Sequence, residues 1–250
     1  MIRAPIAIEW PTGAFCVFCA GIALHATGCN RSQPTASPPP TTPPQAAAPA
    51  VPVVPPAPTN TAAMILPPER TPAELFQAGL KLSEGKGVTK DPTEAVRLFK
   101  LAAERGHVDA QAYLAGAYRT GVGVEKNPAE ATHWFRAAAE QGDARSQGVL
   151  ASIYGTGEGV PKDLPEAVKW YRLAAEQGLV RAQANLGAML YLGQGVAKDP
   201  VEAYKWLHLA ALKNDPDALK NRALVAKVLS VEQMAAGRKR AAEFVPTKTQ

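Results

Sequence analysis

The histidines are the first residues to consider as a source of chemistry. His107, His133 and His208 fall at three different positions of a repeating pattern, and no His-Glu-x-x-His or Cys-His spacing of the kind that binds zinc accompanies them. No nucleophilic side chain has an evident base partner. We therefore expect the histidines to be solvated surface residues, and we predict no metal and no cofactor.

Four glutamates that recur every 36 residues could suggest acid–base catalysis. They are Glu94, Glu130, Glu166 and Glu202. Each lies three residues after an Asp or Asn, which is the spacing of a helix N-cap followed by a carboxylate that reaches back to the cap residue. We assign these glutamates to capping and expect no catalytic residues, so the chain is not predicted to be an enzyme. A constellation assembled from distant repeats stays open.

Gly-x-Gly turns return at the same interval, beginning at Gly85, Gly121, Gly157 and Gly193. Glycines of a phosphate-binding loop follow a strand, whereas these follow a helical pattern, so we exclude a phosphate site. A fixed period of this size with two helical patterns per unit is typical of stacked helical repeats. We predict an all-α, right-handed α-solenoid of helix-turn-helix repeats, with four 36-residue units plus C-terminal capping helices.

Each unit is predicted to contain two helices with distinct boundaries. The first helix stops at the first glycine of the Gly-x-Gly turn. The second begins at the Asp or Asn cap and closes at Gly106, Gly142, Gly178 or Asn214, residue types that tolerate a left-handed backbone. Large apolar residues at one position of the second helix should fill the core, namely Leu98, Trp134, Trp170 and Trp206.

The pattern A-x-x-x-L-G-x-x-Y-x-x-G-x-G-V followed by D-x-x-E-A-x-x-W-Y-x-x-A-A-x-x-G resembles the Sel-one-like repeat, a relative of the tetratricopeptide repeat. The resemblance covers residues 74 to 217, and we assign residues 72–217 to four such repeats. It implies a binding scaffold whose first helices line a concave face. Fold alone does not identify a partner.

The C-terminal part is expected to close the stack. Residues 218–245 read as capping helices, with a capping box at 230–233, and residues 246–250 as a tail. Residues 71–217 carry 17 Lys and Arg against 18 Asp and Glu, and residues 218–250 carry 7 against 2. A solenoid with balanced charge lacks the basic face that nucleic-acid binding requires, so no nucleic-acid partner is predicted. The terminal basic cluster could instead contact an acidic surface such as lipid headgroups or an anionic polymer.

Residues 1–29 read as a signal peptide with a lipobox-like end. An apolar run is followed by small residues and Cys29, which would become the lipid-modified first residue. An ordinary cleaved signal, a retained anchor and a wrongly assigned start are the alternatives. Cys16 and Cys19 also lie in this segment, so no disulfide is expected in the mature fold. We predict a periplasmic-side protein of the bacterial cell envelope, anchored to a membrane through Cys29.

Residues 30–71 read as a disordered linker rich in Pro, Ala and Thr. Residues 30–70 contain thirteen prolines and almost no charge, so they cannot build a core. The segment is expected to be a spacer, and a docking site for a proline-reading partner is the alternative.

A stripe along the first helices is the predicted partner-binding site. Its positions vary between units, as expected of a groove that recognises a specific partner. The predicted residues of the stripe are Gln77, Lys81, Tyr113, Val149, Ile153, Asn185, Met189 and Leu192, and Tyr191, at a different repeat position, is a further candidate. The alternative is that Val149, Ile153, Met189 and Leu192 pack between units.

We therefore expect a monomeric, non-enzymatic scaffold or adaptor that binds a protein or peptide. An envelope enzyme or a cell-wall-polymer-binding protein is the alternative.

Overall fold

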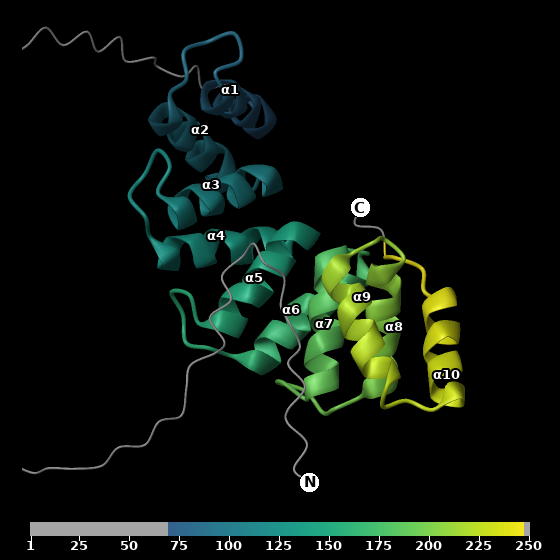
Figure 1. The fold of residues 1–250 in the computed structure, drawn as a ribbon. Helices are drawn as coiled ribbons and strands as arrows, with labels where there is room; N and C mark the ends of the chain where they lie inside the picture. The colour runs from purple at the N-terminus through teal and green to yellow at the C-terminus, as the bar shows by residue number, and fades with distance from the viewer. Residues whose placement is uncertain (1–69, 248–250) are drawn as a thin grey trace, which may run out of the picture. The chain divides into compact units, whose positions relative to one another are not determined.

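The computed structural model describes residues 70–247, and every regular element in this range is an α-helix (Figure 1). The predicted signal peptide, Cys29, nearly all of the linker and residues 248–250 lie outside the described residues. The helices are α1 (Pro72–Glu84), α2 (Pro92–Glu104), α3 (Val108–Thr120), α4 (Pro128–Glu140), α5 (Ala144–Thr156), α6 (Leu164–Glu176), α7 (Val180–Leu192), α8 (Pro200–Ala211), α9 (Pro216–Ala226) and α10 (Val231–Ala242).

Each helix from α1 to α8 packs against the next one in sequence, and the closest pairs are α1 with α2, α3 with α4, α5 with α6 and α7 with α8. Four helical hairpins therefore stack one after another, as the successive colours of Figure 1 show. This arrangement confirms the predicted α-solenoid. The first helices of the units are α1, α3, α5 and α7, with α9 in the same place after the fourth unit, and the second helices are α2, α4, α6 and α8.

The second helices begin where the sequence predicts, but their glutamates act differently. The side chain of Asp163 accepts a 3.0 Å hydrogen bond from the backbone N–H of Glu166, and Asp91, Asn127 and Asp199 cap in the same way. The expected return bond from glutamate to cap is absent from all four second helices.

Three of these glutamates pair instead with a base three residues later on the same helix face. The ion pairs are Glu94 with Arg97 at 2.7 Å, Glu166 with Lys169 at 3.2 Å and Glu202 with Lys205 at 2.8 Å. Side chains at i and i+3 are neighbours on a helix, so a cationic group there competes for the carboxylate. A full capping box does form at Ser230, as predicted, and another at Thr71.

From the second repeat onward, the second glycine of the Gly-x-Gly turn packs against the repeat before it. A Cβ atom on Gly123 would lie 2.2 Å from the main-chain oxygen of Pro92, at the start of the preceding second helix. On Gly159 it would lie 2.5 Å from Cβ of Pro128. Gly87, in the first unit, has nothing within 4 Å of the same position. The turn glycine is therefore required both by its positive φ and by close approach between units.

Buried glutamines tie the second helices to the first helices that follow them. The Gln147 side chain is 4% exposed, and its Nε2 donates a 3.0 Å hydrogen bond to the carbonyl of Ala139. Gln111 and Gln183 make the equivalent bonds to Ala103 and Ala175. These polar side chains recur at the same position of three units and are satisfied by backbone carbonyls, as buried polar groups must be.

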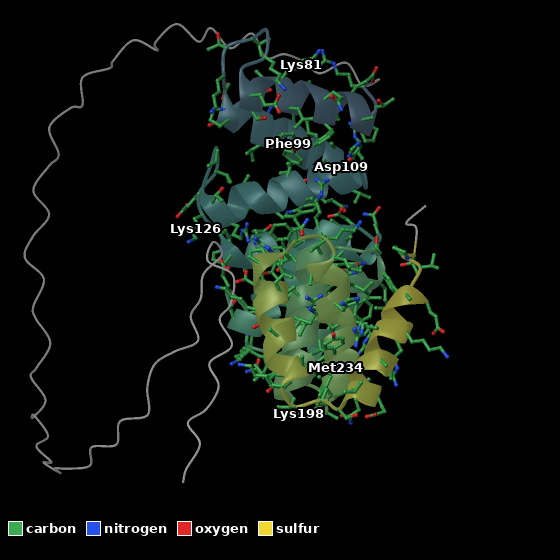
Figure 2. The ribbon with its side chains drawn as sticks, turned by 45° about the vertical axis from the view of Figure 1, so that its right-hand side comes forward. Lys81, Phe99, Asp109, Lys126, Lys198 and Met234 are labelled. Carbon is green, nitrogen blue, oxygen red and sulfur yellow. The ribbon has the colours of Figure 1, made fainter. Side chains whose placement is uncertain are left out.

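The last helix departs from the repeat. Helix α10 packs against α8, whereas α9 takes the usual place after α8 (Figure 1). Gly237 allows this contact, because a Cβ there would lie 2.9 Å from the Tyr204 ring and 3.2 Å from the main-chain oxygen of Val201. Arg240 adds a 3.1 Å ion pair to Glu202. Met234 of α10, labelled in Figure 2, is partly buried against the same core.

Candidate functional site

The predicted first-helix stripe changes from exposed to buried along the chain. Lys81 is exposed, but the residues at the same position of later repeats, Ile153 and Met189, are only 2% and 3% exposed. Tyr191 is also buried. Ile153 and Met189 belong to the repeat core, which is the alternative that the sequence raised for them, and Tyr191 belongs to the core as well. In this part of the stripe these side chains are therefore not exposed to a partner.

The stripe position four residues earlier is occupied by Val149 in α5 and by Asn185 in α7. It lies where these first helices meet the second helix before them. Val149 packs half-buried against the cluster that contains Phe135. Asn185 is half-buried and hydrogen-bonded to the hydroxyl of Tyr171. Burial raises the pKa of Tyr171, while its hydrogen bonds to Ser152 and Asn185 act in the opposite direction. Both stripe residues therefore contribute to the joint between repeats.

The N-terminal part of the stripe is open to solvent. Gln77 and Lys81 are exposed on α1, and Tyr113 on α3 is 49% exposed. Leu192, at the end of α7, is 39% exposed. Figure 2 shows Lys81 and Phe99 in the first repeat. Of the predicted site residues within the described range, these four are the ones with exposed side chains.

An aromatic cluster supports Tyr113 from beneath. Its ring lies 5.3 Å from the ring of Phe76 in an edge-on arrangement and 5.4 Å from the ring of Phe99. The His107 ring also lies close to Phe76, with centroids 4.8 Å apart and planes tilted by 30°. Such pairings fix ring orientation and stabilise the cluster. The sequence pattern did not single out Phe76 and Phe99, although Phe99 shares its repeat position with Phe135 and Tyr171, which are also core aromatics.

A shallow hollow on α1 adjoins this region. It is lined by Arg70, Ala73, Glu74, Gln77, Ala78 and Lys81. Hydrogen bonds from the backbone and side chain of Thr71 lower the pKa of Glu74, so its charge is engaged by the helix cap. The hollow contains two of the predicted site residues, and its open form suits contact with another macromolecule better than enclosure of a small substrate.

The histidines have structural surroundings that the sequence did not indicate. His107 caps α3 by accepting a 3.3 Å hydrogen bond from the N–H of Ala110. His208 is half-buried, stacks on Tyr204 and lies 3.1 Å from the Arg222 guanidinium. Of the three histidines considered, His133 alone is exposed as expected. Within residues 70–247, no group of three or more His, Cys, Asp and Glu is placed to hold a metal ion.

The model of the Sel1 repeat family matches the chain four times, at residues 75–107, 108–143, 144–179 and 180–215. Among solved structures, the Sel1 repeat protein from Oxalobacter formigenes is similar, with 34% identity and a TM-score of 0.61. The similarity covers 70% of this chain and 74% of that protein.

Two further solved structures show lower similarity. The protective antigen c5321 of uropathogenic Escherichia coli is 29% identical with a TM-score of 0.48, over 70% of this chain and 45% of that one. Helicobacter pylori cysteine rich protein B is 24% identical with a TM-score of 0.42, and the similarity covers 54% of this chain and 98% of that one. No curated protein sequence matches this chain. None of the helices in residues 70–247 combines the length and apolar character needed to cross a membrane.

Proposed function

This chain belongs to the Sel1 repeat family, and from that membership we propose that it is a non-enzymatic scaffold that binds a protein or peptide through the open N-terminal part of its first-helix stripe. Proteins of the family are generally protein-interaction scaffolds. In this proposal the partner contacts Gln77, Lys81 and Tyr113, and the buried stripe residues hold the repeats in register.

Tyr113 is the observation that carries the proposal. Its ring is half-exposed, yet it rests on Phe76 and Phe99 and is held in one orientation. A rigid aromatic side chain with a polar hydroxyl is the kind of residue that dominates binding at protein interfaces, because it buries a large area with little loss of side-chain entropy. Lys81 and Gln77, on α1, would supply polar contacts around it.

The proposal also includes a location. Small residues before Cys29 support lipid anchoring on the periplasmic side of the bacterial envelope. The proposal further takes the anchored protein to act as a monomer. Cys29→Ala should then abolish incorporation of labelled fatty acid and release the protein from membranes. A wild-type protein that takes up no label would contradict the anchor while leaving the binding proposal intact.

Binding is tested by affinity capture from detergent-solubilised envelope, followed by titration of the purified captured protein. Tyr113→Ala and Lys81→Glu should each weaken binding of that protein at least about tenfold. Leu173→Ala is the matched control, because Leu173 is a partly exposed apolar residue on a second helix, 37% exposed. It should bind like wild type.

Thermal melting distinguishes lost contacts from lost structure. Because Lys81 is exposed, Lys81→Glu should melt close to wild type. Unchanged binding by both Tyr113→Ala and Lys81→Glu would reject the proposed surface. The proposed surface would also be rejected if binding by the variants fell only in proportion to a lowered melting temperature.

A further inference from the structure

The chain that follows α10 turns back over the second helices and is held there by an aromatic contact. The Phe244 ring meets the Trp206 ring edge-on, with centroids 5.3 Å apart and planes at 72°. The Lys205 ammonium lies 4.2 Å from the Trp206 ring and 5.9 Å from the Phe244 ring. Phe244 is thereby packed against the main core cluster of the C-terminal repeats.

Three residues later the same segment reaches a different repeat. The backbone N–H of Thr247 donates a 2.9 Å hydrogen bond to the main-chain oxygen of Glu176, at the end of α6. Pro246 lies against Gly178, where a Cβ would be 3.5 Å from the proline. The last carbonyls of a helix have no partner within the helix, so this bond satisfies an acceptor that any extended chain could satisfy.

The contacts alternate along the segment. Phe244 is half-buried against Trp206, and Pro246 lies beside Gly178 while remaining exposed to solvent, whereas Val245 between them is 80% exposed. Alternation of this kind, combined with a main-chain hydrogen bond, is how extended peptides are recognised on protein surfaces. The segment also leaves one donor unused, because Nε1 of Trp206 is buried and makes no hydrogen bond. Phe244 thus covers Trp206 without satisfying its buried donor.

The charges around the site are already balanced inside the protein. Glu202 pairs with Lys205 at 2.8 Å and with Arg240 at 3.1 Å. A ligand with a strong charge would therefore gain little there, and recognition would depend on an aromatic side chain and on the main chain.

We propose that Trp206, Lys205 and the end of α6 form a binding site for an extended segment of a partner protein, in which an aromatic residue is followed two positions later by proline. Residues 244–247 occupy this site in the free protein and compete with the partner. The site lies on second helices and uses no residue of the first-helix stripe, so it is independent of the function proposed above.

Competition by a covalently attached segment is strong, because a short tether gives an effective concentration on the order of millimolar. A free peptide with the same contacts should therefore bind the wild-type protein poorly. It should bind well once the attached segment is weakened.

The test uses the full chain with Phe244→Ala and a fluorescent synthetic peptide of residues 243–250, followed by fluorescence anisotropy. We expect the peptide to bind this variant at least about tenfold more tightly than wild type. A peptide whose phenylalanine is replaced by alanine should not bind. Val245→Ala is the matched control and should behave as wild type, since Val245 is exposed.

A second variant guards against loss of structure in Phe244→Ala. Thr247→Pro removes the N–H that bonds to Glu176 and restricts the backbone only at this exposed end of the chain, so it should also admit the peptide while melting near wild type. If folded Phe244→Ala and Thr247→Pro bind no peptide, the site is merely a packing contact and the proposal is overturned. Equal binding to wild type and variants would overturn it too, because the attached segment would then not compete.

A second copy of the chain is the other occupant that the experiment detects. A concentration-dependent dimer of the wild-type protein that Phe244→Ala abolishes would show exchange of C-terminal segments between copies. That result would overturn the assignment to a partner protein. A wild-type protein that stays monomeric, together with peptide binding to Phe244→Ala, would support it.

Discussion

The side-chain amide of Gln177 donates a 2.7 Å hydrogen bond to Oε1 of Gln147, thirty residues earlier in the chain. The same bond, also 2.7 Å, joins Gln141 to Gln111 one repeat before. Gln111 and Gln147 therefore each bond on one side to the second helix of the preceding unit and on the other to the end of their own unit's second helix. Successive repeats are tied by polar contacts as well as by apolar packing.

Replacement of one buried glutamine should weaken this connection. We expect Gln147→Ala to lower the free energy of unfolding by about 1–3 kcal/mol, because the buried groups that it bonds lose a partner. Urea unfolding followed by circular dichroism measures the change. Gln77→Ala, on the exposed face of α1, should stay within about 0.5 kcal/mol of wild type. Equal losses in the two variants would contradict the role assigned to Gln147.

The turn glycines offer a comparison at nearly constant backbone conformation. Gly87 and Gly123 have φ angles of 74° and 75°, but only Gly123 touches the preceding repeat. Gly87→Ala should lower the free energy of unfolding by about 1 kcal/mol, because alanine is strained in the left-handed backbone conformation. Gly123→Ala should cost about 1–3 kcal/mol more, since its Cβ would overlap Pro92. Thermal melting of the two variants measures the difference, and identical melting temperatures would refute close contact at Gly123.

Capping and core residues of α6 should differ in their contribution to stability. Asp163→Ala removes a side-chain cap and should cost about 1 kcal/mol. Trp170→Ala should cost about 3–5 kcal/mol, because the ring is 7% exposed and its removal leaves a cavity. Denaturant titration of both proteins tests this order. A Trp170→Ala protein as stable as Asp163→Ala would disprove the burial pattern.

His208 should make stability depend on pH. Burial, and then the nearby charges of Arg222 and Arg238, hold the pKa of this imidazole below its usual range. Below about pH 6.5 the unfolded chain therefore binds a proton that the folded chain binds less readily. The stabilisation is complete above that pH and is lost as the pH falls towards the folded-state pKa.

A replacement of the imidazole isolates this dependence. The difference in unfolding free energy between wild type and His208→Gln, measured from pH 5 to 8, should change with pH only below about pH 6.5. A difference that stays constant over this range would contradict the assignment.

Much of the fold was predictable because local chemistry determines it. Asp163 and Gly157 mark helix boundaries through capping and positive φ, and both lie where the sequence placed them. The docking of α10 on α8 was not predictable, since it depends on Gly237 meeting Tyr204 from a distant part of the chain.

The site was less predictable than the fold, for a physical reason. Recurrence shows which positions vary, but a variable position can be exposed in one unit and buried in the next. Lys81 and Met189 share a repeat position with opposite environments. The exposed Tyr113 was identified, whereas its support by Phe76 and Phe99 requires three helices to converge.

The contact between Gly123 and Pro92 reappears between Gly159 and Pro128, so the joint between neighbouring units has the same parts each time. A gene segment encoding residues 108–143 could therefore be duplicated in tandem, and the added unit would meet both neighbours through joints that already exist. The same duplication placed after residue 226 would find no such joint, because α10 departs from the repeat. Evolution can thus lengthen this protein by whole interior units, while its C-terminal end stays constant.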